Sequence, residues 1–322
     1  MDKRRKKYMA KQRRRTPKQG GGELGPCDCG CGGEGVRVPP GEVFAFLEAN
    51  RTEGDVADMK ECQHAQARGD AATALDAYRR GLHIDGSPQE EMLETLVMLG
   101  PMAPPWILAR WIVSQAYGWM LLNEDPRTDE AVRMTLACCY SIPEKWDPQE
   151  FLEFGTSVGA CDWVAHELAT YDLGGLADFV DVVVDDEFKE AAPMIEDWVN
   201  APLRPYRYES SGELAVRISD LNTGEELEVI DRGCLDGSSL GAVVLGRVVP
   251  ALPDGPHMFA SRPLAVDEIT AYRAGYLESG SGFPGWLLAV GSGFHDGRIP
   301  EGVGRRTAHV LDDRLMEYLP AS

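Results

Sequence analysis

The sequence lacks a long uninterrupted apolar run. Its longest apolar stretch, PMAPPWILARWIVSQAYGWMLL at residues 101–122, is broken by prolines, by Arg110 and by Gln115, and we interpret it as a buried helix rather than a membrane span. No apolar signal-peptide core follows the basic start, so export is not expected. We expect a protein of the bacterial cytoplasm without a membrane partner. Its eight cysteines are expected to stay reduced in that compartment.

Complete catalytic motifs are also missing. The chain has no glycine loop of the P-loop or dinucleotide-binding type. His166-Glu167 has half the pattern of a zinc-hydrolase helix, but Thr170 stands where the second histidine belongs. Gly291-Ser292-Gly293 with His295-Asp296 lacks the full Gly-x-Ser-x-Gly elbow. We therefore expect a protein that is not an enzyme, and a hydrolase using His166 or His295 is the competing interpretation.

Charge is unevenly distributed along the chain. The formal net charge is −20, but residues 1–19 hold ten basic residues and one acid, a net of +9, which leaves −29 on the remainder. The basic residues are Lys3, Arg4, Arg5, Lys6, Lys7, Lys11, Arg13, Arg14, Arg15 and Lys18. We expect an arm that is disordered when free. Contact of the arm with nucleic acid or the ribosome is one hypothesis for its role. The alternative is a tail that stays solvated or folds back on its acidic body.

Three cysteines occupy alternate positions in the segment GPCDCGCGGEG: Cys27, Cys29 and Cys31. Zinc prefers four thiolate or imidazole ligands in a tetrahedron, and Cys62 or His64 is the nearest source of a fourth. Residues two apart on a helix do not share a face, so only one of these two can join. A metal-free remnant with reactive thiols and a redox site are the alternatives, although Cys-x-x-Cys is absent.

Helical periodicity dominates the region from Gly41 to residue 200. A short amphipathic helix is predicted from near Glu42, Gly69-Asp70 marks the turn between two antiparallel helices, and Ser87-Pro88 is typical of a helix start. Further helices are predicted at Trp106–Gly118, Thr128–Cys139 and Pro148–Phe154, and on both sides of Gly174-Gly175. About seven to nine helices suffice for a bundle or a short solenoid.

Part of this region, AQARGDAATALDAYRRGLHID, resembles one tetratricopeptide unit. It has Gly-Asp at the turn and then Ala74, Leu75, Tyr78 and Leu82 at helical spacing. Such units are stable only beside stacked neighbours. An ordinary helical hairpin is the alternative.

The pattern changes after the prolines of APLRPYRY at 201–208, which we interpret as a domain boundary. A β-hairpin is predicted around Asn222-Thr223-Gly224, because apolar and polar residues alternate on both sides, in GELAVRISDL and EELEVID. Two more strands are predicted in GAVVLGRVVPAL and HMFASRPLAV. A helix is predicted to follow over Asp267–Leu277. The predicted fold class is α+β and multidomain. An N-terminal all-α bundle or short solenoid precedes a small antiparallel, barrel-like β domain.

The predicted organisation has five parts. They are a disordered basic arm (1–24), a cysteine-rich segment (25–40), a helical domain (41–200), a small β-rich domain (206–277) and a glycine-rich segment with a terminal helix (278–322).

The run Ser219–Glu226, followed by Val229, Arg232 and Leu245–Pro250, resembles a module of bacterial SEC-C proteins, which carry the C-terminal zinc motif of the SecA translocase. The segment Gly25–Gly32 looks like the first half of that zinc motif. Val38 and Pro39 stand where the resemblance places the closing cysteine or histidine pair. The resemblance implies a terminal zinc clip that docks onto a partner protein or ribosome.

These features together predict a non-enzymatic interaction or adaptor protein, with zinc as its expected cofactor and a protein or ribosomal partner. The alternative is a nucleic-acid-associated regulator or mobile-element protein that binds through the basic arm. Binding dominated by phosphate contacts weakens steeply with ionic strength, so the two hypotheses differ in their salt dependence.

Overall fold

The computed structural model describes residues 50–81, 83, 86–141, 147–212, 215–230, 240–252, 255–277 and 283–299. All of them fall within Arg37–Ser322, one of the two units into which the chain divides, and the other unit is Met1–Val36. Cys27, Cys29, Cys31 and the ten basic residues of the arm lie outside the described residues. The helices predicted near Glu42 and at the C-terminus begin outside them too.

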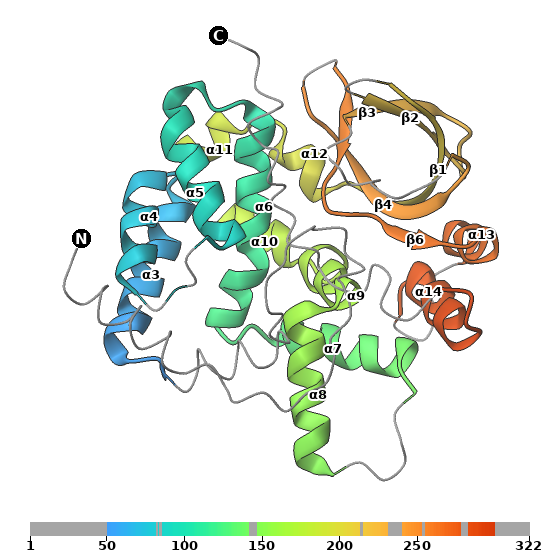
Figure 1. The fold of residues 1–322 in the computed structure, drawn as a ribbon, viewed down its shortest axis with the longest axis horizontal. Helices are drawn as coiled ribbons and strands as arrows, with labels where there is room; N and C mark the ends of the chain where they lie inside the picture. Colours follow the sequence, from blue (N-terminus) through green and yellow to red (C-terminus); the bar gives the residue numbers. More distant parts are fainter. Residues whose placement is uncertain are drawn as a thin grey trace, which may run out of the picture. The chain divides into compact units, whose positions relative to one another are not determined.

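Helices fill the first part of the described chain (Figure 1). They are α3 (Glu53–Ala67), α4 (Ala71–Arg80), α5 (Pro88–Leu99), the short 3₁₀ helix η1 (Gly100–Met102), α6 (Pro105–Leu122), α7 (Pro126–Cys139), α8 (Pro148–Cys161), α9 (Trp163–Glu167), the π-helical turn η2 (Leu168–Asp172), α10 (Gly175–Val182), α11 (Asp186–Ala191) and α12 (Ile195–Val199). The expected all-helical first part of the fold is confirmed.

Local sequence explains where several helices begin. Thr52 and Asp55 form a capping box at α3, and Ser87 caps α5 ahead of its first-turn proline. The predicted α3–α4 hairpin is confirmed, with Gly69 at φ 72° in its turn. A side chain at Gly69 would also meet the ring of Phe188, at 2.9 Å from the added Cβ. Glycine is therefore required here by backbone conformation and by packing.

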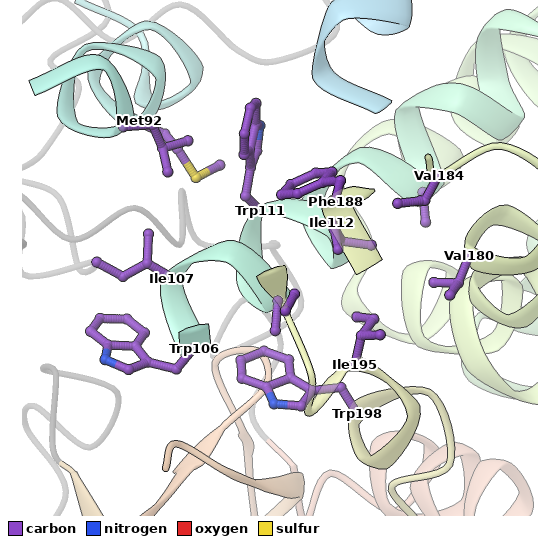
Figure 2. Packing of buried hydrophobic residues seen from close by; sticks show 14 of the residues in the cluster. Met92, Trp106, Ile107, Trp111, Ile112, Val180, Val184, Phe188, Ile195 and Trp198 are labelled. Carbon is purple, nitrogen blue, oxygen red and sulfur yellow. The ribbon is translucent and has the colours of Figure 1, made fainter. Parts of the chain in front are cut away.

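The core of the helical part is built around α6. Trp111 and Ile112 on this helix are almost inaccessible, and the indole of Trp111 packs edge-on against Phe188 of α11, with 5.0 Å between ring centroids (Figure 2). Trp198 of α12 is fully buried, and its Nε1–H donates to the carbonyl of Pro250, 3.0 Å away. The same core cluster includes Val249 and Met258, so it continues into the strands.

Six strands follow the helices (Figure 1). They are β1 (Leu203–Ser211), β2 (Ala215–Asp220), β3 (Glu226–Ile230), β4 (Val243–Pro250), β5 (His257–Phe259) and β6 (Leu264–Val266). The predicted hairpin is confirmed as β2 and β3. The stretch 201–208, interpreted as a boundary, contains the start of β1, and the fourth predicted strand is divided into β5 and β6.

Five of the strands close into a barrel, which confirms the predicted α+β class. The order is β1-β2-β3-β5-β4, with β4 pairing back to β1 and β6 added beside β4. Every pairing is antiparallel except β3 with β5. A closed ring with an odd number of strands cannot alternate direction throughout, so one parallel pair is required. The barrel interior holds Tyr206, Ile218, Val229 and Phe259.

Two helices follow the barrel: α13 (Glu268–Tyr276), where the sequence predicts it, and α14 (Gly285–His295), which it does not. The glycines that obscure α14 in the sequence are packing points. A side chain at Gly291 would collide with the backbone of Cys138 on α7, and one at Gly293 with Thr270 on α13. In the part of the chain that the structure covers, no helix is both long and apolar enough to span a bilayer.

Candidate functional site

A groove of about 970 Å³ lies between the helices. The central helix α6 contacts both α3 and α7, and side chains from all three helices and from α8 line the groove. The lining includes Met59, Gln63, Trp119, Leu121, Phe151 and Leu152. A volume of this size is at the upper end of small-molecule sites, and it can also take a peptide segment.

Three hydrogen bonds fix the register of α3 on α6. Trp111 Nε1–H donates to Gln66 Oε1 at 3.1 Å, and Gln115 Nε2 donates to the carbonyl of Gln66 at 3.4 Å. Farther along, Gln63 Nε2 donates to the carbonyl of Gly118 at 3.2 Å. Lower numbers on α3 meet higher numbers on α6, so the helices are antiparallel. The start of α3 therefore lies toward the Leu121 end of α6.

The groove exposes large apolar side chains. Leu121 of α6 is 45% exposed, and Phe151 and Leu152 at the start of α8 are 42% and 61% exposed. Trp119 and Met59 line the same groove and are partly buried. Isolated exposed apolar residues need no explanation, but several in one concave surface indicate a binding site.

The wall formed by α7 and α8 is rigid. Val132 lies against Gly159, where an added Cβ would be 3.1 Å from its methyl carbon. The carbonyl of Gly159 accepts the hydroxyl of Tyr117 at 2.5 Å and Nε2–H of His166 at 3.0 Å. The Tyr117 and His166 rings stack with 3.8 Å between centroids. This close packing holds the α8 side of the groove in place.

The surroundings of His166 are those of a partly buried residue that supports packing. Burial lowers the pKa of His166 to about 4, against the opposing effect of its hydrogen bond to Gly159. A neutral imidazole packed on Tyr117 and bonded to a backbone carbonyl is held in one orientation. Glu167, its sequence neighbour, points instead to Arg247 at 2.8 Å. The half-motif His166-Glu167 thus divides between two separate contacts.

The two metal-ligand candidates on α3 lie on different faces, as their spacing predicts. Cys62 is 3% exposed within the core, whereas His64 is exposed. Burial raises the pKa of Cys62 to about 11, and the hydrogen bond from Gln66 opposes this only partly. Zinc binds the thiolate, so this environment disfavours Cys62 as a ligand. Within the described ranges, no three His, Cys, Asp or Glu side chains gather at a metal site.

Arg247, in the run Leu245–Pro250, joins the barrel to the helices. Arg247 donates to Glu167, to Asp172 at 2.7 Å and to the carbonyl of Ala201 at 2.6 Å, and it lies 4.1 Å from the Tyr171 ring centroid. Burial opposes its charge, but Glu167 and Asp172 outweigh that effect and raise the pKa of Arg247. Arg247 therefore joins strand β4 to the helical part of the fold through buried ion pairs and a hydrogen bond.

The hairpin residues that resemble the SEC-C module also have structural roles. Asp220 is 2% exposed, and its Oδ1 accepts backbone N–H bonds from Asn222 at 2.7 Å and Thr223 at 3.2 Å. Its other oxygen accepts from Arg204 at 2.8 Å, and Gly224 supplies φ 74° to the turn. These contacts stabilise the turn between β2 and β3, which is a structural role.

Ser292 and His295 are not paired. The Ser292 hydroxyl accepts from Arg273 at 2.9 Å and from Arg298 at 3.1 Å, while His295 Nδ1 lies 3.4 Å from the hydroxyl of Ser141. The Ser292 hydroxyl itself donates to Asp296 Oδ2 at 3.3 Å. A serine nucleophile paired with a histidine base needs that base within hydrogen-bond reach, and His295 contacts Ser141 instead.

The sequence predicts the helices around the groove but not the groove itself. The signal available was the stretch Phe151-Leu152, with Phe154 close behind, because apolar residues so closely spaced cannot all face one core. The α3–α4 hairpin buries Ala74 and Leu75 as a tetratricopeptide unit would. Leu82 lies outside the described residues.

No protein-family model matches the chain, and searches of curated proteins and of solved structures find no match either. The resemblance to SEC-C proteins and to a tetratricopeptide unit therefore stays a prediction from the sequence.

Proposed function

We propose that this chain is a non-enzymatic interaction protein of the bacterial cytoplasm, and that its groove binds a helical segment of a protein partner. The observation that carries the proposal is the exposure of Leu121, Phe151 and Leu152 in one concave surface between packed helices. Cys62 and Cys138 form no disulfide, which is in keeping with a reducing compartment.

The apolar lining of the groove and the net charge of the chain together favour one kind of partner. Grooves between helices commonly take an amphipathic helix, whose apolar anchors recur at helical spacing. The residues beyond 1–19 carry a net charge of −29. A positively charged partner would be attracted over longer distances and would bind faster. The proposed partner segment is therefore an amphipathic helix with Leu or Phe anchors and basic flanks.

The N-terminal elements are proposed to add a second contact. In this view Cys27, Cys29 and Cys31 hold zinc together with one further ligand, and the basic arm contacts the same partner or the ribosome. A short linked contact can raise the overall affinity without changing the groove.

Selection from a phage-displayed library of helical peptides tests the proposal on the full chain. We expect selected peptides to carry Leu or Phe at i, i+3 or i+4, and i+7, with Lys or Arg at their ends. Leu121→Asp and Leu152→Asp should each weaken their binding at least tenfold, which corresponds to about 1.4 kcal/mol. Both side chains are partly exposed, so neither change should unfold the protein.

Val182→Asp is the matched control. Val182 of α10 is 77% exposed and lies outside the groove lining, so the same chemical change there should leave peptide affinity unaltered. The proposal fails if no peptide is selected, or if peptides bind the two groove variants and the wild type equally.

A further inference from the structure

We propose that the first occupant of the groove is the chain's own segment 42–49, which a partner helix must displace. Displacement by a partner rests on the proposed function, whereas docking of the segment is argued from the structure and the sequence. The segment lies outside the described residues and is predicted from its sequence to be an amphipathic helix.

The chain enters the described structure beside the groove. Arg51 is itself a lining residue. The antiparallel register of α3 on α6, set by the Gln66 and Gln63 hydrogen bonds, directs the start of α3 toward Leu121. The segment before Arg51 therefore begins at the end of the groove where α6 exposes an apolar side chain.

The connection between this segment and α3 is short and bent. Asn50 has helical backbone, but the Thr52 capping box starts α3 anew, with Thr52 in an extended conformation. Only Arg51 and Thr52 separate Asn50 from α3. So short a link holds Asn50 close to the first turn of α3 and to the groove that Arg51 lines.

The composition of the segment matches the exposed lining. Residues 42–50 read EVFAFLEAN, and Val43, Phe46 and Leu47 share one face at helical spacing while Phe44 lies next to it. Nine residues of helix span about 13 Å, and the exposed apolar side chains available to such a helix in the groove are Leu121, Phe151 and Leu152. Burial of these apolar faces against each other is favourable.

A partner helix can displace the segment by competing for the same apolar lining. Glu42 and Glu48 flank the apolar residues of the segment, and the groove lining includes Arg51 and Arg133 beside Asp129, so the charges that line the groove do not oppose docking. Tethering favours docking, because a short linker gives an effective concentration in the millimolar range. A basic partner helix would compete with the segment for the groove. The apparent affinity of the partner equals its intrinsic affinity multiplied by the fraction of molecules whose groove is open.

Hydrogen exchange of the full-length protein tests the docking without any partner. The backbone amides of residues 43–50 should exchange at least tenfold more slowly in the wild type than in Leu152→Asp. Phe44→Asp combined with Leu47→Asp should accelerate the same amides to a similar degree. Val182→Asp should behave as the wild type does, and thermal melting should confirm that each variant is folded.

The outcomes separate this inference from the proposed function. Equal exchange of residues 43–50 in the wild type and Leu152→Asp overturns the inference, whether those amides are fast or slow. The peptide experiment is read independently: if docking is present but no external peptide binds, the proposed function fails alone. If both hold, the Phe44→Asp and Leu47→Asp variant should bind the selected peptides more tightly than the wild type.

Discussion

Arg247 and Glu167 stand 80 positions apart in the sequence, and Nε of the arginine lies 2.8 Å from Oε2 of the glutamate in the protein interior. Their side chains are only 7% and 4% exposed. Ser261 donates to the other carboxylate oxygen at 2.8 Å. This fully bonded pair fixes strand β4 to the end of α9, so the barrel and the helices depend on each other for stability.

Arg247→Leu should lower the free energy of unfolding by about 3–5 kcal/mol, because it leaves Glu167 buried without its counter-ion. Urea unfolding followed by circular dichroism measures this. Arg217→Leu is the control, since Arg217 lies 3.6 Å from Glu226 at the surface and exposed pairs contribute at most about 1 kcal/mol. Replacing Glu167 by Leu as well should recover part of the loss. A change below 1 kcal/mol for Arg247→Leu would contradict the anchor role.

His166 should make the fold less stable in acid. Its pKa is about 4 in the folded protein, against 6.5 for the ordinary side chain. The unfolded chain therefore binds the proton more readily, and stability falls as the pH drops from about 6.5 to about 4, by roughly 3 kcal/mol in all. The carboxylates with lowered pKa add a loss in the same direction.

Comparison with His166→Gln isolates the histidine. Urea unfolding at pH 7 and pH 5 should give a difference between wild type and variant that shrinks by about 2 kcal/mol at the lower pH. Parallel pH profiles for the two proteins would show that folding does not lower the pKa of His166.

Zinc content tests the cysteine cluster and the identity of its fourth ligand. We expect near-stoichiometric zinc in the purified full chain, and loss of zinc when Cys27, Cys29 and Cys31 are all changed to Ser. Cys62→Ser should retain zinc because Cys62 is buried with a raised pKa, whereas His64→Ala should bind zinc more weakly. Absence of metal from the wild type would end the zinc hypothesis.

The basic arm distinguishes the two hypotheses about partners. If the arm makes the main contact, affinity for single-stranded RNA should fall steeply with salt, and deletion of residues 1–19 should abolish it. Arg217→Gln removes one exposed positive charge outside the arm and serves as the control. Unchanged RNA affinity after deletion of the arm would exclude the nucleic-acid hypothesis.

Local elements of the fold could be predicted because their signals lie within a few residues of each other. Thr52 with Asp55 and Ser87 with Pro88 start helices through contacts inside one turn. The alternation around Asn222-Thr223-Gly224 likewise encodes the β2–β3 hairpin. The helix α14 escaped prediction because its glycines suggest a loop, and only the close approach of α7 and α13 explains them.

The sequence by itself determined the helical first part, the hairpin and the basic arm, because propensity, capping and charge are properties of neighbouring residues. Tertiary structure alone decided that Cys62 faces the core while His64 faces solvent, that β3 and β5 close the barrel in parallel, and that Leu121 and Leu152 share one groove. Those outcomes depend on which faces of distant segments meet, and no local pattern contains that information.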